Sequence, residues 1–231
     1  MKSVFWNLRG LANSPTMLTL KKLLMIHKPD ICFISEPWMD IAIFSMRWID
    51  RLGMKLFCVN SRGNLLPNLW CFCSKNINHV LINLDDHQIT LQVDLNGKIF
   101  GLTGVYASNC FVKKRQLWEN LENIQNSINL PWCCMGDFNT ILGAHEQRSN
   151  YRPSNVAVQD FKSWTNINNL IHIYTRRAAY TWSNGRRGRH HIQRRLNRVI
   201  GNQDWFIACN MVTCNTLTKL RSDQFHFKFQ V

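Results

Sequence analysis

The sequence predicts an α/β protein in which mixed β-sheets are covered by helices. Short apolar, β-branched or aromatic runs recur between turn signals, and helical patterns are interspersed among them at irregular intervals. At least one pair of runs is joined by a hairpin turn, which does not suit a purely parallel doubly wound sheet. No linker, repeat or low-complexity tract divides the 231 residues. We therefore expect one domain, although two small domains would also fit this length.

The expected elements follow from periodicity and turn chemistry. Helices are expected at residues 14–27, 112–128 and 156–170; in the first, Ser14 suits the N-cap and Pro15 the first helical position. Residues 180–182 run into the turn Ser183-Asn184-Gly185, which is typical of a hairpin. Strands are expected at residues 4–6, 31–34, 69–72, 80–84, 89–93, 99–106, 132–135, 196–200 and 225–229.

Polar residues follow several of these strands directly, at Asn7, Glu36, Tyr106, Asp137 and Asn139. The ends of strands are where sites assemble in α/β proteins. Glu36 could serve a hard cation such as Mg²⁺, and the alternative is an ordinary surface glutamate. Asp137 and Asn139 could face one water or phosphate, and the alternative is a turn or a helix cap.

The charge favours a polyanionic partner. Lysine and arginine number 28 against 14 acidic residues, a formal charge of +14. Residues 161–203 contain no Asp or Glu but eight arginines. Such a stretch binds phosphate backbones, and the alternatives are a solvated basic face or arginines that brace a hairpin. The arginines we expect at nucleic acid are Arg176, Arg177, Arg186, Arg187, Arg189 and Arg195.

The sequence shows no sign of membrane insertion or secretion. No apolar run approaches the length of a spanning helix, and the first residues reach Asn7 and Arg9 too soon for a signal-peptide core. Nine cysteines is an odd count, and their close pairs lie inside apolar runs without C-x-x-C spacing, which favours buried free thiols over metal ligands. We expect an intracellular, nuclear or cytoplasmic protein, a monomer without a membrane partner.

Seven short motifs occur in the order and spacing of one family. The chain resembles the endonuclease/exonuclease/phosphatase family, and most closely the endonuclease domain of LINE-type non-LTR retrotransposons. The retroelement branch is indicated by the stretch Thr181 to Arg186 and by residues 202–205. The motifs occupy residues 6–10, 35–38, 104–108, 136–139, 180–185, 195–198 and 222–224.

The resemblance implies a DNase I-like four-layer α/β sandwich, two packed mixed β-sheets flanked by helices. It also implies a phosphodiesterase site in which Asn7 and Glu36 hold Mg²⁺ or Mn²⁺ and DNA is the partner. The proteins it resembles continue into a reverse transcriptase, so we expect an isolated chain of this kind to be a degenerate or domesticated fragment.

The implied catalytic residues act on the scissile phosphate. Tyr106 would contact it, Asp137 would activate or orient the attacking water, and Asn139 would hold that aspartate and the phosphate in line. Asp223 would flank the catalytic histidine and help to complete the site. The resemblance also implies that the hairpin around Asn184-Gly185 inserts beside the scissile strand, as related hairpins do in the family.

Two positions depart from the family pattern. Asn197 stands where the family has an aspartate, and Gln224 stands where it has the catalytic histidine. Glutamine cannot carry a proton charge at neutral pH, and His226 would lie about 7 Å further along a strand. The sequence thus predicts a metal-dependent DNA endonuclease of impaired activity. The alternatives are an inactive remnant that binds nucleic acid and, against the charge and the hairpin, a phosphatase acting on a lipid or small molecule.

Overall fold

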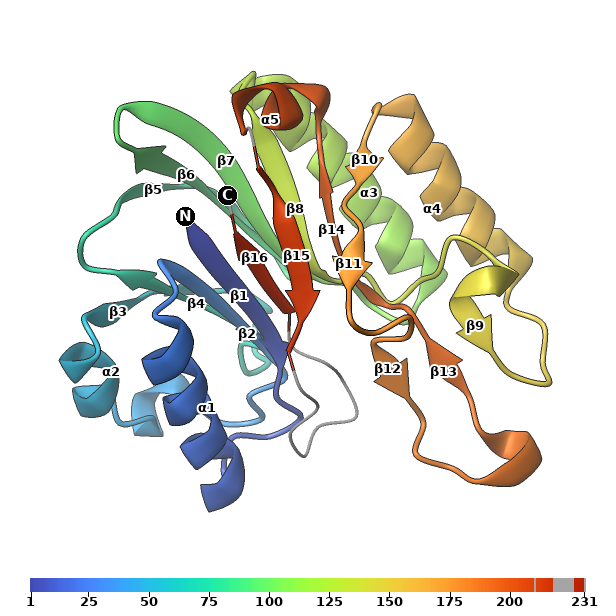
Figure 1. Ribbon diagram of the computed structural model, residues 1–231, viewed down its shortest axis with the longest axis horizontal. Helices are drawn as coiled ribbons and strands as arrows, with labels where there is room; N and C mark the ends of the chain where they lie inside the picture. Colours follow the sequence, from blue (N-terminus) through green and yellow to red (C-terminus); the bar gives the residue numbers. More distant parts are fainter. Residues whose placement is uncertain (210, 218–226, 231) are drawn as a thin grey trace.

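Two large β-sheets lie face to face in the computed structural model, which describes residues 1–209, 211–217 and 227–230 (Figure 1). The seven-stranded sheet contains, in order, β11 (Thr175–Arg176), β15 (Thr213–Thr216), β16 (Phe227–Gln230), β1 (Lys2–Asn7), β2 (Ile31–Ser35), β4 (Leu69–Ser74) and β3 (Met54–Val59). The six-stranded sheet contains β10 (Ile171–His172), β14 (Asn197–Gly201), β8 (Trp132–Asp137), β7 (Lys98–Tyr106), β6 (Gln88–Leu95) and β5 (Asn78–Leu84). A small third sheet contains β12 (Trp182–Ser183), β13 (Gln193–Arg194) and β9 (Gln147–Arg148).

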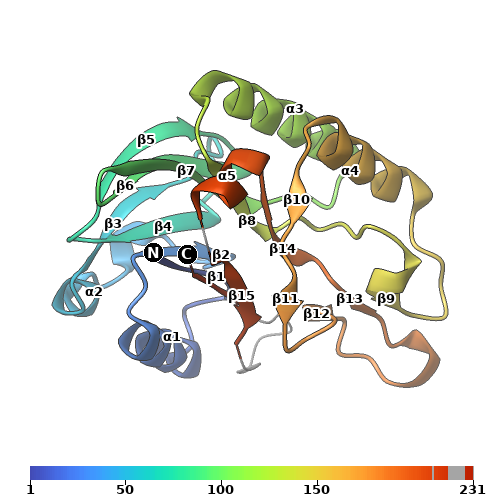
Figure 2. The same cartoon turned by 45° about the horizontal axis from the view of Figure 1, so that its top comes forward.

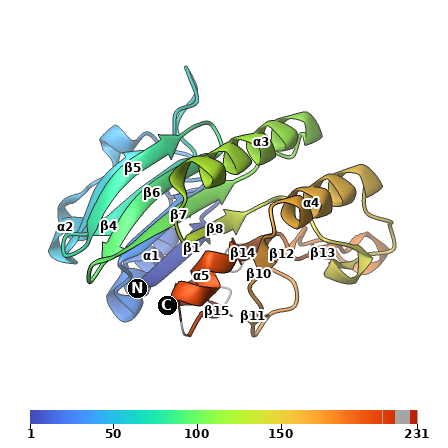
Figure 3. The same ribbon diagram turned by 90° about the horizontal axis from the view of Figure 1, so that it is seen from above.

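Helices cover the outer faces of the two large sheets (Figures 1 and 2). Helices α1 (Ser14–His27) and α2 (Arg47–Arg51) lie on the seven-stranded sheet, and α3 (Phe111–Ile128) and α4 (Asn155–Ile167) lie on the six-stranded sheet. The remaining helical segments are η1 (Ile41–Ile43), η2 (Ala144–Glu146), η3 (Gly188–His190) and α5 (Gln203–Ala208). In the view from above, α3 lies next to β7, and α4 lies on the side of β12 and β13 (Figure 3).

Alternation along the strands sends one set of side chains into the space between the sheets. Phe5 and Phe33 of the seven-stranded sheet pack there with Leu91, Leu102 and Met135 of the six-stranded sheet. Apolar burial of this kind is the main force that holds the two sheets together. The other set faces outward, where α1 covers Trp6, and where Trp118 of α3 stacks on Trp164 of α4 at 4.7 Å between ring centroids. The predicted four-layer α/β sandwich is therefore confirmed.

The helix and strand predictions hold with small shifts at the ends. Every strand predicted between residues 4 and 135 is present, and so are the three helices. The N-cap of α1 is Asn13 rather than Ser14, because the Asn13 side chain accepts the Thr16 backbone N–H at 2.8 Å. The last predicted strand is present as β16, while Phe225 and His226 lie outside the described residues.

The predicted hairpin is present, but its connection is wider than the three residues 183–185 that the sequence indicated. Strands β12 and β13 do pair antiparallel, but the loop between them runs from residue 184 to residue 192 and contains η3. The Asn184 side chain organises this wider loop, because its amide oxygen accepts the backbone N–H groups of Arg186 and Ile192 and its amide nitrogen donates to the His190 carbonyl. The loop projects beyond the sheets at the end opposite α2 (Figure 1).

The cysteines are free thiols, and seven of the nine are buried. Cys58 is half-buried and Cys110 is exposed. Across the described ranges, we find no helix long and apolar enough to cross a membrane.

Candidate active site

The polar residues that end the strands of both sheets meet at one edge of the sandwich. Asn7 ends β1 beside Ser35, the last residue of β2, and Glu36 follows directly. In the facing sheet, Tyr106 ends β7 and pairs in register with Asp137 at the end of β8. Because β1 and β2 run parallel, as do β7 and β8, each pair delivers its last side chains to the same edge.

Hydrogen bonds join the two halves of this cluster. The Asn7 amide nitrogen donates to Glu36 Oε1 at 2.6 Å and to Asp137 Oδ2 at 3.5 Å. The Tyr106 hydroxyl donates to Glu36 Oε1 at 2.8 Å. Burial, with the charges of Glu36 and Asp137, raises the pKa of Tyr106 well above its usual range. The phenol is therefore a proton-bearing donor at neutral pH, set between two carboxylates.

Glu36 is held by the backbone as well as by these partners. Its φ of 52° lies in the left-handed region, which costs a residue other than glycine roughly 1 kcal/mol or more. The chain accepts this conformation because the Glu36 carbonyl takes the Gly10 backbone N–H at 2.9 Å, and the Glu36 N–H donates to the Asn68 carbonyl at 2.9 Å. Strained residues of this kind concentrate at functional sites.

The segment Gly136-Asp137-Phe138-Asn139 leaves β8 by a turn that needs its glycine. A Cβ atom at Gly136 would lie 1.9 Å from the Val105 carbonyl oxygen, so no larger residue fits beside β7. Asn139, at φ 48°, directs its backbone N–H to Asp137 Oδ1 at 3.0 Å. Its side-chain amide nitrogen donates to the Ala107 carbonyl at 2.6 Å. Asn139 thus holds the aspartate with its backbone, while its side chain anchors the loop after β7.

Lys114 is a site residue that the sequence did not reveal. Its side chain is only 6% exposed, and its ammonium donates to the Asn139 carbonyl at 2.5 Å. Burial lowers the pKa of Lys114, and the charge of Asp137 opposes this shift. Two adjacent lysines at the start of a helix give no sign of which one is buried, so only the fold distinguishes Lys114.

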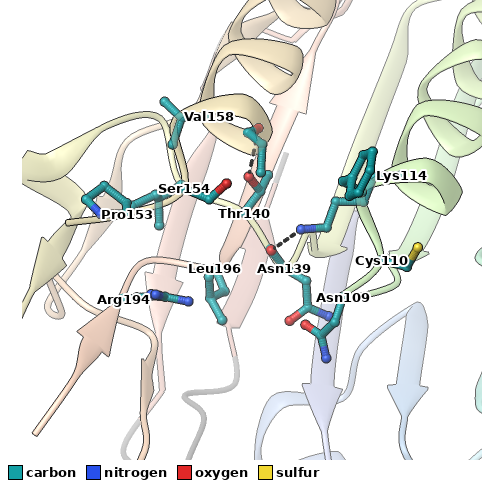
Figure 4. Close-up of a pocket in the computed structure, with 13 residues that line it drawn as sticks. Asn109, Cys110, Lys114, Asn139, Thr140, Pro153, Ser154, Val158, Arg194 and Leu196 are labelled. Atoms are coloured by element: carbon teal, nitrogen blue, oxygen red, sulfur yellow. Dashed lines mark hydrogen bonds between the residues drawn. The ribbon is translucent and has the colours of Figure 1, made fainter. Parts of the chain in front are cut away.

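A cavity of about 410 Å³ opens beside Asn139 (Figure 4). Lys114 and Arg194 contribute cations to its wall, Asn109 contributes an amide, and Leu196 contributes an apolar surface. Its lining contains no carboxylate. The cavity therefore extends the site with a surface that suits an anion or a polar group.

Asn197 lies next to Asp137 on the neighbouring strand. The two residues are register partners in the antiparallel pair of β14 and β8, so Asn197, Asp137 and Tyr106 form one row across three strands. Asn197 is buried, and its backbone N–H donates to Thr181 Oγ1 at 2.9 Å. An amide therefore occupies a central position of the cluster. Asp223 and Gln224 lie outside the described residues.

The arginines of the acid-free stretch divide into two groups. Arg195 is half-buried, donates to Thr175 Oγ1 and lies 3.9 Å from Glu146 Oε1, which makes it partly a brace. Arg198, which is 1% exposed, donates to Glu146 Oε2 at 2.7 Å in a buried ion pair that the sequence did not reveal. The exposed arginines are Arg176, Arg177, Arg186, Arg187 and Arg189.

The donor set at the cluster fits a hard divalent cation. Glu36 and Asp137 supply carboxylate oxygens on either side of the Asn7 amide. Mg²⁺ binds through one or two carboxylates and completes its shell with water and substrate phosphate oxygens. Within the described ranges there is no group of three or more His, Cys, Asp or Glu side chains placed to hold a metal.

The sandwich is a DNase I-like fold, and solved structures share this fold over the full chain. The endonuclease domain of TRAS1, a telomere-specific non-LTR retrotransposon, is 13% identical with a TM-score of 0.74, covering 100% of this chain and 97% of that one. An AP endonuclease from Archaeoglobus fulgidus is 14% identical with a TM-score of 0.71, covering 100% and 98%. A 3′ phosphatase, NExo, from Neisseria bound to a product DNA hairpin is 18% identical with a TM-score of 0.71, covering 100% and 98%.

The sequence also matches a family model directly. The chain belongs to the endonuclease/exonuclease/phosphatase family, whose model matches residues 4–213. No curated protein sequence matches the chain.

Proposed function

We propose that the chain is a divalent-metal-dependent DNA endonuclease of the LINE retroelement type, with reduced activity. The observation that carries the proposal is the hydrogen-bonded cluster of Asn7, Glu36, Tyr106 and Asp137, which joins the ends of strands from both sheets. Two carboxylates, an amide and a protonated phenol at one point suit the hydrolysis of a phosphodiester better than the binding of an apolar ligand.

Each residue has a role that follows from its contacts. Glu36, with Asn7 and Asp137 beside it, would hold Mg²⁺ or Mn²⁺, which when bound neutralises charge on the phosphoryl oxygens. Asp137 is oriented by the Asn139 backbone N–H and would accept a proton from the attacking water. The protonated Tyr106 hydroxyl would donate to a phosphate oxygen, and the Asn139 turn would keep the aspartate in line with that phosphate.

The reduced rate follows from the two positions that differ from the family. In the resemblance, an aspartate and a histidine supply the charge and the proton that the leaving oxygen needs. Asn197 and Gln224 cannot supply either, so the leaving oxygen would take its proton from solvent. Loss of one general acid or base costs about 10²- to 10⁴-fold in rate, and the losses of two residues that act together do not add.

DNA is the proposed substrate because a similar structure holds a DNA hairpin and because this chain carries a charge of +14. The exposed arginines on the loop of residues 184–192 and at Arg176 and Arg177 would contact phosphates. Asp223 would complete the site beside Gln224.

A second candidate function is nucleic-acid binding without cleavage. Asn197 favours it, because an amide fills a buried position in register with Asp137. The basic loop would be preserved in such a remnant, since the hydrogen bonds that hold it are made by Asn184 and do not involve Asn197.

The decisive experiment is the nicking of supercoiled plasmid by purified protein with Mg²⁺ or Mn²⁺, with DNA binding measured in parallel. Nicking that is abolished by Asp137→Ala and by a chelator supports the endonuclease. Asp50→Ala is the matched control, because this exposed carboxylate pairs with Lys75 on the surface. Binding without nicking supports the remnant. The absence of both binding and nicking would contradict both proposals.

A further inference from the structure

Trp38 is more exposed than any other tryptophan of the chain. The chain has nine tryptophans, all within the described residues, and Trp38, at 64%, is the only exposed one. Trp48 and Trp182 are half-buried, and the other six are buried. Tryptophan offers a large apolar surface that folding normally removes from water. An isolated exposed apolar residue needs no explanation, but this one lies two residues after Glu36.

The backbone fixes Trp38 beside the candidate active site. The Leu11 N–H donates to the Pro37 carbonyl at 2.9 Å, next to the bond from the Gly10 N–H to the Glu36 carbonyl. These bonds tie the turn that carries Trp38 to the turn that follows Asn7. The same short segment therefore positions Glu36 and the indole ring.

Two further features show that the backbone and the ring of Trp38 have a defined position. Trp38 has a φ of 51°, a left-handed conformation that is a steric outlier for a bulky side chain. Its ring lies against Gly10, where an added Cβ would meet ring carbon Cε3 at 3.0 Å. Gly10 itself has a φ of 101°, so the backbone under the ring is shaped for a residue without a side chain.

We propose that Trp38 is a stacking platform for an unpaired nucleobase of the strand whose phosphate lies at Glu36. An aromatic ring fixed beside the proposed phosphate site, in a protein of charge +14, suits single-stranded nucleic acid, which is bound by base stacking on aromatic side chains together with positive charge. Stacking is sequence-tolerant, because every base has a π-face. This inference rests on the proposed function, since it takes nucleic acid as the partner. A protein partner for the ring is the competing outcome of the test.

The test compares ligands with and without bases. Fluorescein-labelled oligodeoxythymidylate and an abasic phosphodiester chain of the same length are titrated with protein in Ca²⁺, a divalent cation that carboxylates bind and that allows a ligand phosphate to lie at Glu36. Trp38→Ala should weaken binding to oligodeoxythymidylate by about 5- to 100-fold and leave binding to the abasic chain unchanged. Trp38→Phe should recover most of the loss. Ile43→Ala is the control, because it removes an exposed apolar side chain without a ring.

Tryptophan emission gives a readout that a bracing role would not change. Because only Trp38 is exposed, quenching by acrylamide reports mainly on its ring. Bound oligodeoxythymidylate should protect the wild-type emission from acrylamide, whereas the abasic chain should not. The Trp38→Phe variant should show no such protection.

Three results would overturn the platform. The first is unchanged oligodeoxythymidylate binding in Trp38→Ala, and the second is an equal loss for both ligands, which would make the ring a brace. The third is equal wild-type affinity for both ligands with no protection of emission, which would leave the ring to a protein partner. Base-dependent binding through Trp38 without plasmid nicking would support the stacking platform and contradict the endonuclease. Plasmid nicking together with unchanged oligodeoxythymidylate binding by Trp38→Ala would support the endonuclease and contradict the stacking platform.

Discussion

At the scale of single residues, Asn197 marks where the site departs from the chemistry its fold suggests. It is buried and pairs in register with Asp137, so a carboxylate there would lie in the row that Asp137 and Tyr106 form. We predict that Asn197→Asp together with Gln224→His raises plasmid nicking by about 10²-fold or more, because the pair supplies a charge and a titratable proton donor. The single variants should gain much less, since the two groups act as one unit.

The measurement is the initial rate of nicking by the double variant and by the same variant carrying Asp137→Ala. The gain of the double variant should disappear when Asp137→Ala is added to it. An unchanged rate would mean that positions 197 and 224 do not correspond to the family's aspartate and histidine.

His172 gives the fold a predicted sensitivity to acid. Its ring packs edge-on against Phe161, and both ring nitrogens are buried without a hydrogen-bond partner. Burial lowers the pKa of His172 from 6.5 to about 4, the charges of Arg198 and Arg195 add to the shift, and Glu146 opposes it. The unfolded chain therefore binds a proton that the folded protein refuses between these two pKa values, so stability falls as the pH drops through that window.

We predict that acidification from about pH 7 to about pH 5 removes on the order of 2 kcal/mol through this residue. His172→Phe keeps an aromatic ring and has nothing to protonate, so its stability should fall less over the same range. Urea denaturation of both proteins at the two pH values measures the difference. Parallel losses in the two proteins would assign the acid sensitivity to other groups.

At the scale of elements, the loop of residues 184–192 is the part of the proposed DNA surface best suited to substitution. Arg186, Arg187 and Arg189 are exposed, and the Asn184 side chain holds the loop without them. We predict that changing all three to alanine lowers the slope of log affinity against log salt by about 3 for duplex DNA, since each neutralised phosphate contributes about 0.9. The melting temperature should not fall, because these side chains do not hold the loop and their loss reduces the net positive charge.

The matched control removes three exposed cations on and after α2, at the far side of the molecule from the loop (Figure 1). Arg47, Arg51 and Lys55 changed to alanine should leave the salt slope near that of the parent. An equal drop in both triple variants would show that the charge acts diffusely rather than through the loop.

Elements with a long regular pattern could be predicted from the sequence, and short or irregular ones could not. The longer strands and helices up to residue 135 follow from periods of two and 3.6 residues. Strand β3 was missed because its residues are mostly half-buried at the sheet edge, and the two-residue strands of the third sheet are too short to carry a pattern. The wide loop after β12 depends on a side chain that bonds to the backbone eight residues later, which no local turn rule includes.

The candidate site divides in the same way. Asn7, Glu36, Tyr106, Asp137 and Asn139 could be proposed because each follows an apolar run and matches a motif, and the structure brings them together. Lys114 and the pair of Glu146 and Arg198 could not, because their partners lie 25 and 52 residues away in the chain.

At the scale of the whole molecule, net charge acts on the fold and on binding in opposite senses. Ion pairs made by Lys75, Arg115, Arg195 and Arg198 are present among the described residues, but the chain has 28 lysines and arginines against only 14 acidic residues. Exposed pairs stabilise a protein by less than about 1 kcal/mol each. Repulsion within the excess positive charge therefore opposes folding, and salt screens that repulsion.

We predict that raising potassium chloride from about 20 mM to about 150 mM increases the free energy of unfolding of the DNA-free protein, while it weakens duplex binding by tenfold or more. Urea denaturation and fluorescence anisotropy at the two salt concentrations measure the two effects on one preparation. Chloride binding at a specific site would also stabilise the fold, so potassium fluoride serves as a second salt and should act equally. A protein that is destabilised by both salts would show that its ion pairs outweigh its net charge.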